Sequence, residues 1–373
     1  MQTFKLRVDF PVYCAGFSPA GDILIGGGGG SVKTGIKNKF ELYKLNITEK
    51  TPFEKITELE LKRNEDAPSC LAFHPEENVI ACSINSPKEK IELGENKNCR
   101  TFEYSNNKIK SIKEIQTITS KNEYDFQRVT NFSSNGKFIA IGGTDSKLTV
   151  LKYPSFEAVF PPLNFNKQEV YDADFNPACD QVVAISTKIL RILSIKNGEC
   201  IHSLESPIFQ KVIQCQFRAC RFGKGKSEGF LFTVVNLISK TKSFIVKWDA
   251  VTLERILTKV VSKKPITSFA ISDDGNLLAL GCSDQSLKIC DANTLRILLT
   301  VPNLHEFPAT SVNFNHDSTL VVSGSVDYSV SLIKLPEKFN NGVIGKSSLF
   351  VIILTTLITI LAYVYKLYLD EQN

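Results

Sequence analysis

The sequence predicts an all-β protein, in which a seven-bladed β-propeller is followed by one C-terminal transmembrane helix. Three observations support this prediction. The composition favours pleated sheets, because Phe, Val, Ile, Thr and Tyr are plentiful while Met and Trp occur once each. A short phrase recurs along most of the chain, and an uncharged apolar run follows the last copy.

The composition is that of a folded protein with a sizeable core. Of 373 residues, 43% are hydrophobic and 22% are charged, which is too hydrophobic for a disordered chain. The net charge of +5 is small, and Lys and Arg are interspersed with Asp and Glu, so nucleic acid is not expected as a partner. The ten cysteines include no C-x-x-C pair, which fits a reducing compartment.

The recurring phrase contains an apolar residue, Phe, a polar turn and a second apolar run. Seven copies follow one another at a spacing of roughly 42 to 59 residues, close to the period of WD-type blades. The copies read AGFSPAGDILIG, LAFHPEENVIAC, TNFSSNGKFIAIGG, ADFNPACDQVVAI, CQFRACRF, FAISDDGNLLALG and VNFNHDSTLVVSG. A pair of stacked sheets is the alternative, but seven copies in phase favour a propeller.

The turns between the second and third strands support WD-type blades. Three copies place an Asp there, at Asp145, Asp284 and Asp327, and the single Trp–Asp dipeptide, Trp248 and Asp249, ends the third strand of copy five. The sequence thus resembles the WD-repeat family over residues 1–335. The last copy has only about three strands, so a strand over Phe4 to Phe10 is expected to complete it and close the ring.

The remaining residues predict a membrane anchor. Residues 336–347 are polar and contain Gly, which indicates a linker. Residues 348–368 include the apolar run from Leu349 to Tyr365 and predict a transmembrane helix, with residues 369–373 as a short lumenal tail. The N-terminus lacks an apolar signal segment, so the propeller is expected to face the cytosol. A buried core helix is the alternative interpretation of this segment.

The first copy departs most from the repeat. It inserts IGGGGGSVKTGIKNKF between its second and third strands, including five consecutive glycines and an apolar Ile36 at the expected tip. Glycines allow positive φ and expose amides and carbonyls, so the loop could wrap an ion or a partner's backbone. A flexible linker is the alternative. A phosphate-binding P-loop is excluded, because Ile36 stands where that motif requires Lys.

Other departures fall on the same face of the predicted propeller. The charged hairpin from Ser83 to Asn98 and the connection into copy two, with Pro68, belong there. Taken alone, Pro68 is better explained as an ordinary proline at the start of a strand than as a functional residue. The four histidines lie in different repeats, and no triad or metal cluster is apparent. The sequence therefore predicts a binding protein without covalent catalysis.

The glycine run followed by GIKNK in the first blade, the seven repeats and the C-terminal span together resemble one family. It is that of the endoplasmic reticulum guanine nucleotide exchange factors for the Sar GTPase, which start COPII coat assembly. The resemblance implies an ordered loop around a potassium ion that presses on the GTPase. Matched by motif, the loop around the ion comprises Gly26, Gly27, Gly28, Gly29, Gly30, Thr34 and Gly35, and the residues that act on the GTPase are Ile36, Asn38 and Pro68.

The resemblance also implies a location and partners. A single-pass protein of the endoplasmic reticulum membrane with a cytosolic propeller is expected, with a Sar-type small GTPase and COPII-associated scaffold proteins as partners. Two other functions stay open: a trafficking accessory for a specific cargo that has lost exchange activity, and a membrane-tethered WD scaffold with a flexible glycine loop. The short lumenal tail departs from family members that carry a long one.

Overall fold

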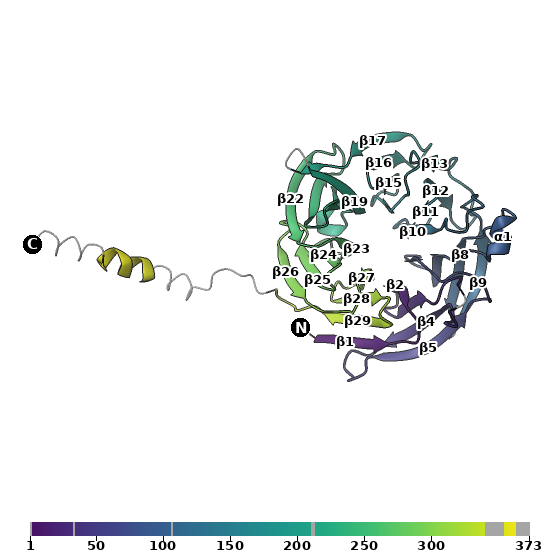
Figure 1. Ribbon diagram of the computed structural model, residues 1–373, viewed down its shortest axis with the longest axis horizontal. Helices are drawn as coiled ribbons and strands as arrows, with labels where there is room; N and C mark the ends of the chain where they lie inside the picture. Colours follow the sequence, from purple (N-terminus) through teal and green to yellow (C-terminus); the bar gives the residue numbers. More distant parts are fainter. Residues whose placement is uncertain (1, 33, 106, 210–212, 340–353, 363–373) are drawn as a thin grey trace, which may run out of the picture. The chain divides into compact units, whose positions relative to one another are not determined.

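The computed structural model describes residues 2–32, 34–105, 107–209, 213–339 and 354–362. The chain divides into two compact units, Met1–Glu337 and Lys338–Asn373. The first unit is a ring of seven antiparallel sheets (Figure 1), which confirms the predicted all-β class and seven-bladed propeller.

Each blade is a meander whose first long strand lies towards the centre of the ring (Figure 1). From the inside outwards, the first three blades are β2 (Val12–Phe17), β3 (Ile23–Gly27), β4 (Lys39–Leu45) and β5 (Phe53–Glu60); β6 (Leu71–Phe73), β7 (Val79–Ser83), β8 (Cys99–Ser105) and β9 (Lys108–Ile115); and β10 (Gln127–Phe132), β11 (Phe138–Gly143), β12 (Lys147–Lys152) and β13 (Leu163–Asn164). The next three are β14 (Asp172–Phe175), β15 (Gln181–Ile185), β16 (Ile189–Ser194) and β17 (Cys200–Glu205); β18 (Ile208–Phe209), β19 (Ile213–Phe222), β20 (Phe230–Leu237), β21 (Ser243–Asp249) and β22 (Arg255–Ser262); and β23 (Ile266–Ile271), β24 (Leu277–Cys282), β25 (Leu287–Asp291) and β26 (Ile297–Val301).

The seventh blade closes the ring with both ends of the propeller. It contains β27 (Ala309–Phe314), β28 (Leu320–Ser325), β29 (Ser329–Lys334) and the N-terminal strand β1 (Gln2–Arg7), which pairs antiparallel with β29. This confirms that the N-terminal strand completes the last blade, although the strand ends at Arg7 rather than Phe10. The innermost long strands also contact one another in sequence around the ring, from β2 through β27 and back to β2.

The recurring phrase forms the turn between the first and second strands of a blade. The inner strands β2 and β10 end at Phe17 and Phe132, and four residues later Gly21 and Gly136 adopt φ of 88° and 69°. Glycine takes this left-handed conformation at little cost. The amide of Gly21 donates to the carbonyl of Ser18 at 2.9 Å, so the turn is closed by its own backbone.

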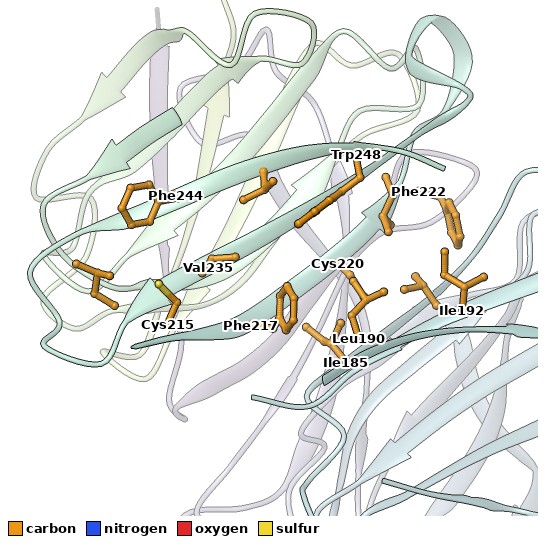
Figure 2. Close-up of a cluster of buried hydrophobic side chains, with 14 residues drawn as sticks. Ile185, Leu190, Ile192, Cys215, Phe217, Cys220, Phe222, Val235, Phe244 and Trp248 are labelled. Carbon is orange, nitrogen blue, oxygen red and sulfur yellow. The ribbon is translucent and has the colours of Figure 1, made fainter. Parts of the chain in front are cut away.

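The core lies between neighbouring blades rather than within one. In the cluster of Figure 2, Ile185 and Leu190 of blade four pack against Phe217 and Trp248 of blade five, and all four side chains are buried. The indole Nε1 of Trp248 donates to the hydroxyl of Thr233 at 2.9 Å, which satisfies its buried polar atom. Equivalent clusters join blades one and two, two and three, three and four, five and six, and seven and one.

Two features go beyond the repeat. Blade five has an additional short strand, β18, on the inner side of β19. The predicted charged hairpin of blade two contains a short helix, α1 (Lys88–Glu92), and its return is held by the buried side chains of Asn96 and Asn98. The insertion is therefore an ordered part of the blade.

In the second unit, residues 354–362 are helical (Figure 1). Within the residues that the structure describes, no helix is both long and apolar enough to cross a bilayer. Much of the predicted span, 348–353 and 363–368, lies outside the described residues, as do the lumenal tail and the linker from residue 340. The transmembrane helix therefore stays a prediction.

Candidate functional site

The glycine loop, residues 28–38, connects β3 to β4 in blade one. Gly26 and Gly27, which the motif assigned to the loop, are instead strand residues that pair with Phe40 and Lys39. A Cβ on Gly26 would lie 2.8 Å from the Phe40 ring, and one on Gly27 would overlap the carbonyl oxygen of Pro11. These two glycines are needed for close packing of the sheet, so the loop proper begins at Gly28.

Asn38 holds the two ends of the loop together. Its side-chain oxygen accepts a hydrogen bond from the amide of Gly30 at 2.9 Å, and its Nδ2 donates to the carbonyls of Gly30, at 2.9 Å, and Glu65, at 2.7 Å. Gly28 and Gly30 have φ of 144° and 77°. A side chain on Gly28 would overlap Asn38, so the glycines let the backbone close around this amide.

The distal part of the loop folds back over its glycines. The Thr34 hydroxyl accepts a hydrogen bond from the amide of Ile36 at 3.2 Å and packs so closely on Gly29 that a Cβ there would overlap it. Ile36 is half-buried against the cluster that contains Phe10, rather than standing free at the tip. The exposed apolar side chain of the loop is Val32, with 73% of its surface accessible. Sequence reasoning missed Val32, although its place in the same insertion could have drawn attention to it.

Pro68 lies beneath the base of the loop, in the connection to blade two. It is buried, and its carbonyl oxygen lies 3.7 Å from the Sγ of Cys14, which is also 3.7 Å from the carbonyl of Gly26. Burial raises the pKa of the Cys14 thiol well above its ordinary value, so this group stays a neutral donor. The structure thus joins Pro68 to the strand from which the glycine loop emerges.

The connection between blades one and two is fixed by buried polar contacts. Glu65, whose carbonyl accepts from Asn38, forms a buried ion pair with Arg100 at 2.9 Å. The amide of Asp66 donates to the carbonyl of Asn85 at 3.1 Å. The loop, this connection and the insertion of blade two therefore form one continuous surface, as the sequence predicted.

A charged cluster anchors the strand that leaves the loop. Lys39 is buried and pairs with Glu41 at 2.8 Å and Asp9 at 2.9 Å. Burial disfavours the charged lysine, but the hydrogen bonds to the two carboxylates outweigh it and raise the pKa of Lys39. The hydroxyl of Tyr43 donates to Glu41 at 2.5 Å, so Glu41 is held from two sides. Removing one partner of the buried pair Lys39–Glu41 would cost about 3–5 kcal/mol, so these side chains hold the start of β4 in place.

The oxygens that surround Gly28 and Gly29 suit a monovalent cation. The atoms nearest to a Cβ built on either glycine belong to residues 34–38, and they include Thr34 Oγ1, the carbonyl oxygens of Ile36 and Lys37, and Asn38 Oδ1. These donors are neutral, and within the described chain no group of three or more His, Cys, Asp or Glu side chains could hold a metal. Neutral carbonyl and hydroxyl oxygens are ligands of the kind that potassium takes.

A cavity of about 590 Å³ opens beside the loop at the centre of the ring. Gly30 and Asp66 form one side of its wall, and connections and inner strands of the other blades form the rest. Val326, from the turn between the second and third strands of blade seven, also lines it, which confirms that these turns share a face with the blade connections. Two arginines in the wall, Arg128 and Arg218, were not predicted as functional.

The amino-acid sequence is similar to a known family model and to known proteins. The family model "WD domain, G-beta repeat" matches residues 255–291 and 297–334, which span β22 to β29. The chain is 26% identical over 350 residues to the guanine nucleotide-exchange factor SEC12 of Candida glabrata, covering 89% of this chain and 72% of that protein. The chain is thus similar to the SEC12 exchange factors, and it contains WD repeats.

Other relatives show similar coverage of the chain. Identity to the guanine nucleotide-exchange factor SEC12 of Mus musculus is 25% over 360 residues, covering 83% of this chain and 82% of that protein. The putative guanine nucleotide-exchange factor SED4 of Saccharomyces cerevisiae is 23% identical over 344 residues, covering 88% of this chain but only 30% of its own length. The SEC12-like similarity thus extends through most of the propeller, well beyond the two repeats that the family model matches.

Proposed function

We propose that the chain is a guanine nucleotide exchange factor that activates a Sar-type small GTPase at the endoplasmic reticulum membrane and starts COPII vesicle formation. Its similarity to proteins named as guanine nucleotide-exchange factors supports the exchange activity. The Sar GTPase and the membrane rest on the resemblance of the motif GGGGGSVKTGIKNK in blade one. The observation that carries the proposal is the glycine loop itself, closed by Asn38 into a fixed shape.

A fixed loop is suited to exchange because it loses little conformational entropy when a partner docks. The free energy of contact can then go into distorting the partner's nucleotide site. If the loop binds the nucleotide-free GTPase more tightly than the GDP-bound form, linkage requires that it weakens GDP binding by the same factor. This is a binding mechanism, and it needs no covalent step from the chain.

The apolar contact to the GTPase is shared by two residues of the loop. Ile36 is half-buried, so its inner part supports the loop and its outer part is left for a partner. Val32 presents most of its side chain to the surface of the same loop. We assign Ile36 to supporting the tip and Val32 to contacting the partner.

Pro68 acts by positioning. Its ring fixes the backbone of the connection whose carbonyl meets Cys14 at the base of the loop. A flexible side chain there would disturb the buried contact and shift Asp66, which lies beside Gly30. Pro68 is thus important to exchange without touching the nucleotide.

A potassium ion would be held by the neutral oxygens of residues 34–38 around Gly28 and Gly29. When bound, it would offset the mutual repulsion of the partial negative charges on these oxygens and so stabilise the turn. The chain's own part is to present them: Thr34 through its hydroxyl and Asn38 through the amide that Gly30 orients. Gly35, with φ of 81°, lets the chain reverse between them.

The anchor over residues 348–368 would keep the propeller at the cytosolic surface of the membrane. Confinement raises the effective concentration of a GTPase that itself associates with the bilayer. The activated GTPase would then stay where it forms, close to scaffold proteins of the coat.

The proposal is tested by release of a fluorescent GDP analogue from purified Sar GTPase. The propeller unit, residues 1–337, closes its own ring and can be added alone, as wild type, Ile36→Ala or Pro68→Leu, in potassium buffer. We expect wild type to accelerate release, and both variants to do so at least about tenfold less. A matched control is Ile256→Ala, an exposed isoleucine of the outer strand β22.

Two outcomes contradict the proposal. No acceleration by a folded wild-type unit would favour a cargo-specific trafficking accessory that lacks exchange activity. Unchanged acceleration after deletion of residues 28–38 would show that the loop is a flexible tether on a WD scaffold.

A further inference from the structure

Five of the inner strands carry a register shift at the same place, near the end that faces the cavity. In each case one residue is left out of the pairing with the second strand, as in a β-bulge. These residues are Tyr13, Arg128, Arg218, Thr267 and Thr310, and all five line the central cavity. In these five blades the bulge therefore directs one side chain into the cavity.

Two of the five show what the scaffold requires at this position. The hydroxyl of Thr267 bonds to the carbonyl of Ala309 in the next blade at 2.9 Å. That of Thr310 bonds to the carbonyl of Val12 in the next blade at 2.8 Å. A threonine is thus sufficient to join neighbouring blades.

Blades three and five carry arginines where a threonine would serve. The Arg218 guanidinium donates to the Thr267 carbonyl at 2.5 Å, which already makes the link to the next blade. Arg128 lies 4.5 Å from the ring centre of Tyr171 and pairs with Glu169 at 2.7 Å, but its Nε is buried without a hydrogen-bond partner. Both guanidinium groups retain donors that the scaffold does not use.

Arg218 is also a partly buried cation without its own counter-ion. Among the described residues, no carboxylate lies within ion-pair distance of it, and nearby Asp172 is already paired with Arg221 at 2.5 Å. Burial lowers the pKa of Arg218, and the attraction of Asp172 offsets this only in part. A buried charge of this kind is stabilised when an anion binds.

We propose that the central cavity binds an acidic side chain of the partner protein, whose carboxylate is held by the guanidinium groups of Arg218 and Arg128. The inference rests on the proposed function, because the same partner would then contact the glycine loop. Gly30 belongs to the glycine loop and also lines the cavity. A protein that binds the loop would therefore cover the mouth of the cavity. The planar fork of arginine matches a carboxylate through two parallel hydrogen bonds.

The variants Arg218→Thr and Arg128→Thr give each bulge the residue that blades six and seven already contain, so folding is expected to be retained. Arg255→Thr makes the same chemical change on the exposed outer strand β22 and serves as the control. Affinity for the nucleotide-free Sar GTPase is measured by biolayer interferometry with residues 1–337, together with stimulated GDP release. Thermal unfolding of each variant checks that it is folded.

We expect Arg218→Thr to weaken binding roughly ten- to hundredfold and Arg128→Thr to weaken it less, with Arg255→Thr unchanged. If wild type is active and Arg218→Thr binds as wild type does, this inference is wrong while the proposed function stands. If wild type neither binds nor stimulates release, both fail. Competition by millimolar inorganic phosphate that Arg218→Thr abolishes would show that the cavity takes phosphate instead, and would overturn the proposal.

Discussion

The side-chain amide of Asn38 donates to the main-chain carbonyl of Glu65 at 2.7 Å and thereby ties the glycine loop to the connection between blades one and two. Glu65 is itself held by a buried ion pair with Arg100. A local loop in one blade is thus braced by the neighbouring blade, which explains how a run of glycines can have a fixed shape.

Asn38→Ala is expected to abolish most of the exchange activity with little effect on the fold. The change removes two donated hydrogen bonds and one accepted bond, a local cost of about 1–3 kcal/mol that loosens residues 28–38. Hydrogen exchange should show faster exchange at these amides, together with slower stimulated GDP release. Asn46→Ala, in the exposed turn of the same blade, is the control. Full activity of Asn38→Ala would mean that the loop needs no fixed shape.

Gly29→Ala is expected to reduce exchange because the added methyl group overlaps the Thr34 hydroxyl. Forcing these atoms apart costs about 1–3 kcal/mol and opens the loop. Gly21→Ala, where a Cβ meets no neighbour but φ is 88°, controls for the loss of a glycine in the same blade. GDP release measures both; equal rates for the two variants would contradict close packing at Gly29.

The repeated turn made the fold predictable. Phe17 and Phe132 recur at the ends of inner strands because every blade presents the same apolar face to its neighbour. This packing requirement appears in the sequence as a repeated residue type. The extra strand β18 and helix α1 were not predictable, because both depend on contacts outside their own segment. The helix segment is held by Asn96, whose bonds reach Ser86 and Asn85.

The site was predictable only in part. The glycine run marked the loop, and GIKNK drew attention to Asn38 and Ile36, whose roles stay predictions. The sequence placed Gly26 and Gly27 in the loop, but they belong to β3. A run of identical residues gives no signal of where a strand ends. Arg218 was missed because a β-bulge, not a motif, turns it into the cavity.

Val32→Ala should separate contact from stability. Because Val32 is largely exposed, its loss should change the free energy of unfolding by no more than about 0.5 kcal/mol, while stimulated GDP release falls about tenfold. Ile36→Ala should lower both, because Ile36 packs against the core. Urea unfolding and GDP release are measured on the same samples. If only Ile36→Ala impairs exchange, Ile36 and not Val32 is the contact residue.

Replacing potassium by lithium should loosen the glycine loop. The smaller ion cannot be reached by all the neutral oxygens around Gly28 and Gly29 without distorting the backbone. Amide hydrogen exchange of residues 28–38 should then be faster, while the turn containing Asp284 in blade six should be unaffected. Equal protection of the loop in potassium, lithium and a large organic cation would exclude an ion from its structure.

His305 is expected to make the propeller less stable as the pH falls from about 6.5 to about 4. Its ring bonds to the hydroxyls of Ser323 and Ser329, each at 3.0 Å, and burial lowers its pKa from 6.5 to about 4 despite the attraction of Asp327. The unfolded chain therefore binds a proton in this range and the folded chain does not. The stabilising contribution is full above pH 6.5 and is lost towards pH 4, by about 3 kcal/mol.

Titration of the Asp327 carboxyl does not account for the loss of stability between pH 6.5 and pH 4. Its hydrogen bonds from Ser329 and the amide of Glu306 outweigh burial and lower its pKa below the ordinary 3.8, so its own contribution is lost only at more acidic pH. Urea unfolding of wild type and His305→Gln between pH 7.5 and 4 isolates the histidine as the difference between the two curves. The variant should be less stable at pH 7.5, and the difference should shrink as the pH falls; a constant difference would mean that His305 titrates alike in the folded and unfolded chains.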